Sequence, residues 1–286
     1  EETGVFVDYR ADGMLGIAYS EEDRARLAEQ AACVRALGGA AQMISGDEAR
    51  AMEPALSGAV IAALYAPDDA QVDPRRALSA LKAWLKERGA PIIAARAQSA
   101  EAQGGGYTVR LESGEKITAG KVVIATGAVS CFAPRTLVFP VKGDMTSVAM
   151  KEGLLTRVVR APDAYLCPKA HGRLVIGATT HIGVSDHKPD PAGVAGLRAN
   201  AQKAVPALEG AQELERWAGL RPGTPDGAPI LGKDARGRFL ALGHYRNGVL
   251  QAPAAAEAVA AVVLGRTPPV DVDVFSIRRF APDQHG

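Results

Sequence analysis

The chain has 286 residues, of which 47% are hydrophobic and 23% are charged, as in an ordinary globular protein long enough to bury a core. Its net charge of +1 and its 5% aromatic content provide neither the basic surface nor the stacking side chains of a nucleic-acid-binding protein. No run of about 18 apolar residues is present, so we expect neither a transmembrane helix nor a membrane partner.

Capping signals and helical spacing of apolar residues predict helices at 20–38, 45–54 and 73–89. Their expected capping residues are Ser20, Ser45 and Asp73. The Ala-rich stretch 253–264, closed by Gly265, predicts a last helix that begins at Pro253.

Strands are predicted between these helices. The candidates are 107–111, 122–125, 173–179 and 239–242. The wholly apolar run at 122–125 is typical of a strand that is covered on both faces of a parallel sheet. Because helices and strands alternate without a clean break, we expect an α/β fold of two interleaved domains with mixed sheets.

Several motifs that would indicate other chemistry are absent from the sequence. It has no GxGxxG turn between a strand and a helix, no P-loop and no GxSxG nucleophile elbow. His181 and His187 lie in one loop, but no HExxH motif or Cys/His cluster accompanies them, so we expect no metal site. The cysteines are three and widely spaced, which predicts buried free thiols and a cytoplasmic location.

Two stretches of the C-terminal third carry a family resemblance. Residues 217–232 read WAGLRPGTPDGAPILG, and residues 243–250 read GHYRNGVL. The first resembles the substrate-arginine segment of the FAD-dependent D-amino-acid oxidase superfamily. The second resembles the glycine oxidase branch of that superfamily, which serves thiamine biosynthesis. Weaker matches at 71–75, 122–130, 140–144 and 172–179 extend the resemblance over nearly the whole chain.

The resemblance implies an FAD-binding doubly wound domain interleaved with a substrate domain built on a mainly antiparallel sheet. Residues 67–133 and 224–286 would belong to the FAD domain, and 1–66 and 134–223 to the substrate domain. The family begins with a strand, a GxGxxG turn and a ribose-binding acidic residue, none of which this chain contains. We therefore expect the FAD domain to lack its first βαβ unit here. An N-terminal segment or a separate chain would then carry that motif.

The substrate site follows from what amine oxidation requires. The substrate Cα must be held against the flavin, and arginine grips a carboxylate with two parallel hydrogen bonds. By resemblance, Arg221 is the carboxylate clamp, although a surface arginine in a turn-rich loop would read the same. Arg246 would lie near flavin and substrate, with either of them as its partner. Tyr165 would line the substrate pocket, or be an ordinary core tyrosine.

The cofactor site rests on two further segments. The strand run ends at 125–127, and the last helix follows the glycine-flanked loop 243–250. Backbone N–H groups at a helix start favour anions, such as the reduced flavin ring. The expected FAD contacts are Ala125, Thr126, Gly127, Arg246, Asn247, Gly248, Val249 and Leu250.

The sequence therefore predicts an enzyme that oxidises the amine of glycine or a related small amino acid to an imine. Oxygen would be the acceptor, giving hydrogen peroxide, and hydrolysis would give glyoxylate and ammonia. No side chain is expected to act as acid or base, because the flavin does the chemistry. Two alternatives remain open, namely a D-amino-acid or sarcosine-type dehydrogenase or oxidase and a non-catalytic amino-acid-binding subunit. The resemblance also implies a homo-oligomer.

Overall fold

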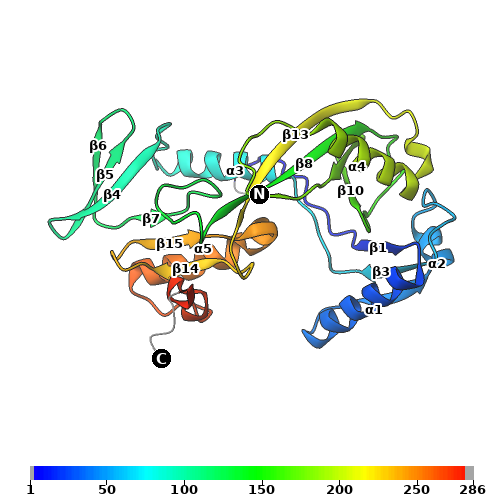
Figure 1. Ribbon diagram of the computed structural model, residues 1–286, viewed down its shortest axis with the longest axis horizontal. Helices are drawn as coiled ribbons and strands as arrows, with labels where there is room; N and C mark the ends of the chain where they lie inside the picture. Colours follow the sequence, from blue (N-terminus) through cyan, green and yellow to red (C-terminus); the bar gives the residue numbers. More distant parts are fainter. Residues whose placement is uncertain (1–2, 281–286) are drawn as a thin grey trace. The chain divides into compact units, whose positions relative to one another are not determined.

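The computed structural model describes residues 3–280 and has a mixed α/β architecture (Figure 1). The α-helices of the described residues are α1 (Glu21–Ala36), α2 (Gly46–Met52), α3 (Pro74–Glu87), α4 (Pro191–Ala204) and α5 (Gly248–Leu264). The short 3-10 helices are η1 (Pro206–Leu208), η2 (Tyr245–Asn247), η3 (Asp273–Phe275) and η4 (Ile277–Phe280).

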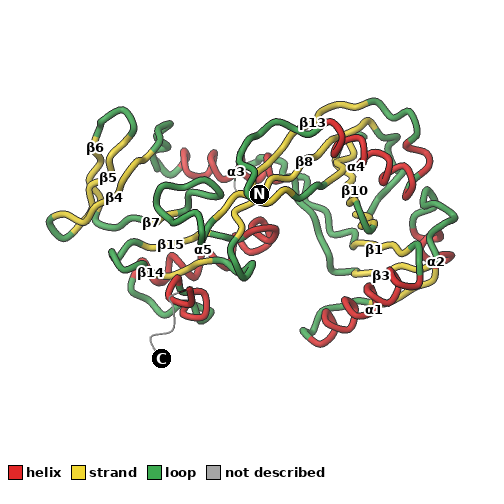
Figure 2. The backbone as a smooth tube through the Cα atoms, in the orientation of Figure 1, coloured by secondary structure: helices red, strands yellow, loops and turns green. Residues whose placement is uncertain are grey.

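The strands form one large sheet and two small ones (Figure 2). The large sheet has the order β12-β8-β11-β10-β9-β1-β3-β2, with β13 also paired to β8, and the small sheets have the orders β14-β15-β7 and β4-β5-β6. The large sheet is mainly antiparallel: β1 runs parallel to β9, whereas β3 pairs antiparallel with β1 and β2, β10 with β9 and β11, and β8 with β11 and β12. The strand bounds are β1 (Met14–Ala18), β2 (Gln42–Ser45), β3 (Ala62–Ala66), β4 (Ala97–Gln103), β5 (Gly106–Leu111), β6 (Lys116–Ala119), β7 (Val123–Ile124), β8 (Phe139–Ala149), β9 (Val158–Ala161), β10 (Ala164–Lys169), β11 (Arg173–Gly177), β12 (His181–Ile182), β13 (Glu213–Gly223), β14 (Ile230–Lys233) and β15 (Phe239–Leu242).

The predicted starts of the first three helices are confirmed by their caps. The Ser20 hydroxyl accepts a hydrogen bond from the Asp23 N–H at the start of α1. Ser45 and Glu48 form a complete capping box at α2. The Asp73 carboxylate caps α3, whose first residue is a proline. Each cap satisfies N–H groups that a helix start leaves without a partner.

The chain divides into two compact units that alternate along the sequence. The first unit comprises Glu1–Pro91, Gly143–Thr180 and His187–Gly219, and the second comprises Ile92–Lys142, His181–Asp186 and Leu220–Gly286. The long strands β8 and β13 each run from one unit into the other. By these contacts, residues 67–91 lie in the first unit, whereas the sequence groups them with the cofactor domain. The division into cofactor and substrate domains itself concerns binding and stays a prediction.

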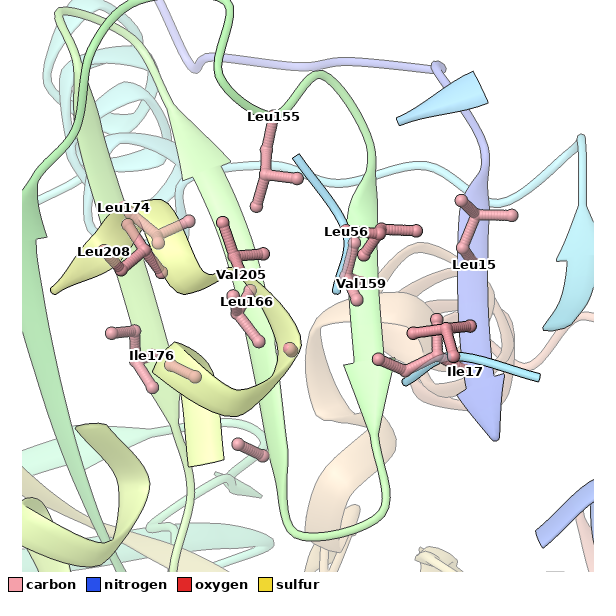
Figure 3. Packing of buried hydrophobic residues seen from close by; sticks show 14 of the residues in the cluster. Leu15, Ile17, Leu56, Leu155, Val159, Leu166, Leu174, Ile176, Val205 and Leu208 are labelled. Carbon is pink, nitrogen blue, oxygen red and sulfur yellow. The ribbon is translucent and has the colours of Figure 1, made fainter. Parts of the chain in front are cut away.

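The first unit has a hydrophobic core on one face of the large sheet. Figure 3 shows Leu166 of β10 with Leu174 and Ile176 of β11, beside Val205 and Leu208, which follow α4. All five side chains belong to one buried cluster and are at most 7% exposed. Each Å² of buried apolar surface contributes about 25 cal/mol, so the burial of this cluster stabilises the sheet that contains β10.

The second unit has its own core beneath the β14-β15-β7 sheet. Ile124, Ile230, Leu240 and Leu242 are buried in one cluster there. The strand predicted at 122–125 is present as β7, but the prediction that both faces are covered is wrong, because Val123 is 44% exposed. β7 is the last strand of its sheet among the described residues, so one side of it has no neighbouring strand.

The last helix begins earlier than the sequence predicts. α5 starts at Gly248 and contains Pro253 in its interior, where the ring removes the N–H that would bond the Val249 carbonyl. The rule that places proline in the first turn therefore misplaced the helix start. Gly265 ends the helix in the left-handed conformation, as predicted.

The C-terminal helical stretch is more apolar than the sequence analysis expected. The helical stretch Tyr245–Leu264, with mean hydropathy 1.4, is long and apolar enough to cross a membrane by length and composition only, and 11% of it is buried. One such helix is weak evidence for a membrane span, and the absence of a membrane partner stays a prediction.

The described cysteines are free, but Cys33 and Cys131 are exposed, so the prediction of buried thiols is wrong for these two.

Candidate functional site

The centre of the candidate site is a pair of parallel strands in the second unit. β7 pairs with β15, with Val123 opposite Phe239 and Ile124 opposite Leu240. Because the strands are parallel, their carboxyl ends lie at the same edge of the sheet. The two segments predicted to contact a cofactor, 125–127 and 243–250, leave the sheet from that edge. Ligands of α/β proteins bind outside the carboxyl ends of such strands.

The segment after β7 leaves its backbone open. Ala125 and Thr126 are exposed, and Gly127 has a φ of 68° with no atom within 4 Å of the position that a Cβ would occupy. The Thr126 hydroxyl donates to Ser130 Oγ at 2.6 Å, and Ser130 Oγ also accepts from the Phe132 N–H at 3.0 Å. This loop is therefore held in place while the Gly127 backbone remains accessible.

The segment after β15 begins with a glycine that no other residue can replace without strain. Gly243 has a φ of 71°, and a Cβ added there would lie 2.3 Å from Thr224 Cγ2. Thr224 is itself buried and donates through Oγ1 to the Ala228 carbonyl at 2.8 Å. This close approach places the start of the 243–250 loop against the chain three residues after Arg221.

The loop then enters α5 with an irregular backbone. Tyr245 has a φ of 47°, which is uncommon for a residue with a side chain. Asn247 is the N-cap residue of α5, but its side chain makes no capping hydrogen bond. Val249 and Leu250 are 56% and 82% exposed. The helix start therefore presents N–H groups without a side-chain cap, which favours a negatively charged partner.

Both predicted arginines belong to the second unit. Arg221 is half-buried on β13, although it precedes Pro222, so it lies on a strand rather than in a loop. Arg246 lies in η2 and is exposed, with its guanidinium carbon 5.3 Å from the centre of the Tyr245 ring. The contact of Thr224 with Gly243 brings the two arginine-bearing segments together. The ligand-binding roles of both arginines stay predictions.

Tyr165 lies in the first unit, on β10 opposite Gly177 of β11. A Cβ on Gly177 would meet the Tyr165 ring at 2.5 Å, so the ring lies directly over the glycine. The phenol donates a weak hydrogen bond to Met145 Sδ at 3.7 Å. Gly177 therefore fixes the direction of the Tyr165 side chain, and the role of Tyr165 in a substrate pocket stays a prediction.

Two residues that sequence reasoning missed stand at the start of α5. His244 Nε2 and Gln251 Oε1 are buried and have no hydrogen-bond partner among the described residues. Burial lowers the pKa of His244, so its imidazole is neutral at pH 7. Their polarity beside an apolar helix was visible in the sequence, but their burial was not. No group of three or more metal-ligating side chains occurs within residues 3–280.

Comparison with known proteins agrees with this geometry. The family model described as FAD dependent oxidoreductase (DAO) matches residues 1–262. The chain is 33% identical over 289 residues to glycine oxidase from Geobacillus kaustophilus, covering 98% of this chain and 76% of that protein. The crystal structure of glycine oxidase from that organism superposes with a TM-score of 0.92 over 98% of this chain and 78% of that chain.

Two further relatives widen the picture. The bifunctional protein ThiO/ThiG of Synechocystis is 35% identical over 238 residues, which are 81% of this chain and 36% of that protein. The crystal structure of L-proline dehydrogenase from P. horikoshii is 25% identical and superposes with a TM-score of 0.85, covering 98% of this chain and 78% of that chain. Proteins that are named for different substrates, glycine and L-proline, therefore share this fold.

Proposed function

Because the chain belongs to the DAO family of FAD-dependent oxidoreductases, we propose that it oxidises the amine of glycine or a closely related small amino acid. The substrate amine becomes an imine, with bound FAD as hydride acceptor and oxygen taking the electrons as hydrogen peroxide. Water then releases glyoxylate and ammonia. The observation that carries the proposal is the meeting of the Arg221 segment, the 243–250 loop and the end of β7 within one unit.

The residues at this edge fit FAD, the cofactor of the family. The open backbone at Gly127 leaves room for a close approach, and the uncapped start of α5 favours a group that becomes negatively charged. The buried polar atoms of His244 and Gln251 lack partners that a cofactor with hydrogen-bonding groups would supply. Ala125, Thr126 and the residues 246–250 would hold it.

Each protein group has a positioning task. Arg221 binds the substrate carboxylate through two hydrogen bonds and so fixes the position of Cα. Arg246 adds a second positive charge near the carboxylate or the cofactor. A pocket-lining role of Tyr165, whose direction Gly177 fixes, is a separate part of the proposal. The reaction needs no side-chain nucleophile.

The proposal includes a partner segment that carries the GxGxxG motif, in the same polypeptide or in another chain. Its support is the edge of β7 that has no neighbouring strand among the described residues, together with the little-buried α5. A cytoplasmic location is supported by the free cysteines. A role in thiamine biosynthesis is supported by the similarity to ThiO/ThiG, and a homo-oligomer would be tested by light scattering.

The visible spectrum of the purified protein, recorded with and without glycine in the absence of air, tests the proposal. Bleaching of the oxidised flavin band by glycine is the expected result. A flavin band that responds only to sarcosine, L-proline or D-alanine would replace glycine by that substrate class. Peroxide formation after air is admitted tests oxygen as the acceptor. A purified protein without any flavin band would refute the function as stated.

A further inference from the structure

Five buried side-chain polar atoms of the described residues have no hydrogen-bond partner, and two of them, His244 Nε2 and Gln251 Oε1, lie together at the start of α5. η2 and α5 form a continuous helical stretch from Tyr245 to Leu264, directly after His244. Gln251 lies one turn after Gly248 on α5, and His244 lies next to Gly248, so the three positions form one face of the helix start. The space between the two polar side chains belongs to a glycine, whose absent Cβ would lie 3.5 Å from His244 Cβ.

This face lies at the carboxyl edge of the parallel strands. His244 is the second residue after β15, and the parallel neighbour β7 ends at the same edge. Buried polar groups without a partner are rare in folded proteins, and two on one helical face indicate a ligand with hydrogen-bonding groups.

The chemistry of the two groups defines what the ligand must offer. The Gln251 oxygen only accepts hydrogen bonds, so the ligand must present a donor. The neutral imidazole of His244 can accept or donate one bond at Nε2. The ring of oxidised FAD has a single N–H group, at N3, which two carbonyl oxygens flank, and its ribityl chain carries hydroxyls. FAD therefore provides the donor that Gln251 lacks and several partners for His244.

We infer that Gln251 Oε1 accepts a hydrogen bond from the flavin N3–H, and that His244 Nε2 forms a second hydrogen bond with the same FAD molecule. This assignment rests on the proposed function, because it needs FAD at the start of α5. It adds two side chains to the predicted backbone contacts of residues 247–250. It also explains a glutamine in the first turn of a helix whose other polar side chain is Glu257.

The test measures binding of FAD and of FAD methylated at N3 to apoprotein made from the purified holoprotein. The variants are Gln251→Leu, His244→Leu and, as a control, His187→Asn, which changes an exposed histidine. Loss of one hydrogen bond should weaken FAD binding by about 3- to 10-fold in each of the first two variants. Methylation at N3 should weaken binding to the wild type and to His244→Leu, but not further in Gln251→Leu.

Two results would overturn the assignment, and a third would contradict the proposed function. An equal penalty of N3 methylation in wild type and Gln251→Leu would overturn the Gln251 contact. Unchanged FAD affinity in His244→Leu would overturn the His244 contact. Wild-type protein that binds no FAD would instead contradict the proposed function. If Gln251→Leu does not fold, binding of N3-methylated FAD to the wild type still tests the Gln251 contact, because an affinity unchanged by methylation would overturn it.

Discussion

Replacement of Gly243 by alanine should destabilise the second unit through two separate effects. The residue has a φ of 71°, and an L side chain in this left-handed region costs about 1–2 kcal/mol. Its Cβ would also lie 2.3 Å from Thr224 Cγ2, and overpacking in a buried site costs about 1–3 kcal/mol. The free energy of unfolding should therefore fall by about 2–5 kcal/mol in Gly243→Ala.

The two effects can be separated by variants that the chain itself offers. Gly265 has a φ of 70° and nothing within 4 Å of its absent Cβ, so Gly265→Ala should show the backbone cost alone. Thr224→Ser removes the methyl group that causes the clash but keeps the hydroxyl that donates to the Ala228 carbonyl. The double variant of Gly243→Ala with Thr224→Ser should regain the packing part of the loss.

Urea unfolding of the wild type, Gly243→Ala, Thr224→Ser and the double variant gives the coupling energy between positions 243 and 224. A recovery of about 1–3 kcal/mol in the double variant is expected. Equal losses in Gly243→Ala and Gly265→Ala would refute the reasoning, because the clash with Thr224 would then contribute nothing. FAD affinity should fall with Gly243→Ala and return partly in the double variant, since this contact positions the 243–250 loop.

Three further predictions concern the clamp, a buried carboxylate and pH. Arg221→Ala should lower kcat/KM for glycine by the equivalent of about 2–4 kcal/mol of transition-state stabilisation, whereas Arg221→Lys should keep part of that stabilisation. A near-normal kcat/KM in the alanine variant would remove the clamp assignment. Glu53→Ala should cost about 3 kcal/mol of unfolding free energy by urea titration, because this carboxylate is 2% exposed and accepts bonds from Thr156 and Arg157; a loss below 1 kcal/mol would contradict it. The Arg279 guanidinium lowers the pKa of Asp226 from 3.8 to about 2, so their pair stabilises the fold above pH 4 and ceases to do so as the pH falls toward 2. Asp226 is partly exposed, so Asp226→Asn should cost under about 1 kcal/mol at pH 6, and thermal unfolding should show this difference vanish near pH 2.

Local signals predicted much of the fold because the structure uses them locally. Ser20, Ser45 and Asp73 cap the helices that follow them, and the strand at 239–242 lies as its apolar pattern indicates. The registers of the large sheet were beyond such signals, since the pairing of β1 with β9 joins Met14 to Val158, far apart in the sequence. Glu53, which bonds Thr156 and Arg157, illustrates this limit: nothing near it in the sequence indicates a buried carboxylate.

The candidate site was predictable in part for a related reason. The resemblance pointed to 125–127 and 243–250, and the parallel pairing of β7 with β15 brings their ends together. The positions of Arg221 and Tyr165 on strands were not predicted, because the residues around Arg221 are rich in turn formers and the Tyr165 sequence has no distinctive pattern. The contacts of the Arg221 and Tyr165 side chains depend on the tertiary structure, which local sequence patterns do not indicate.

Five exceptions to local rules lie in the segment 244–253, although Asp8 and His171 also have a positive φ and Tyr19, Ser147 and Arg157 also have a buried polar atom without a partner. Tyr245 has a positive φ, Asn247 caps nothing with its side chain, and Pro253 lies inside a helix. His244 and Gln251 add two buried polar atoms without partners. Each of these costs stability, so their occurrence within the ten residues 244–253 indicates a function other than folding. A ligand that bonds the orphaned atoms and the uncapped helix start recovers part of that cost, and it does so only when bound. FAD should therefore raise the Tm of the wild type more than that of Gln251→Leu, and equal shifts would mean that the exceptions serve packing rather than the cofactor.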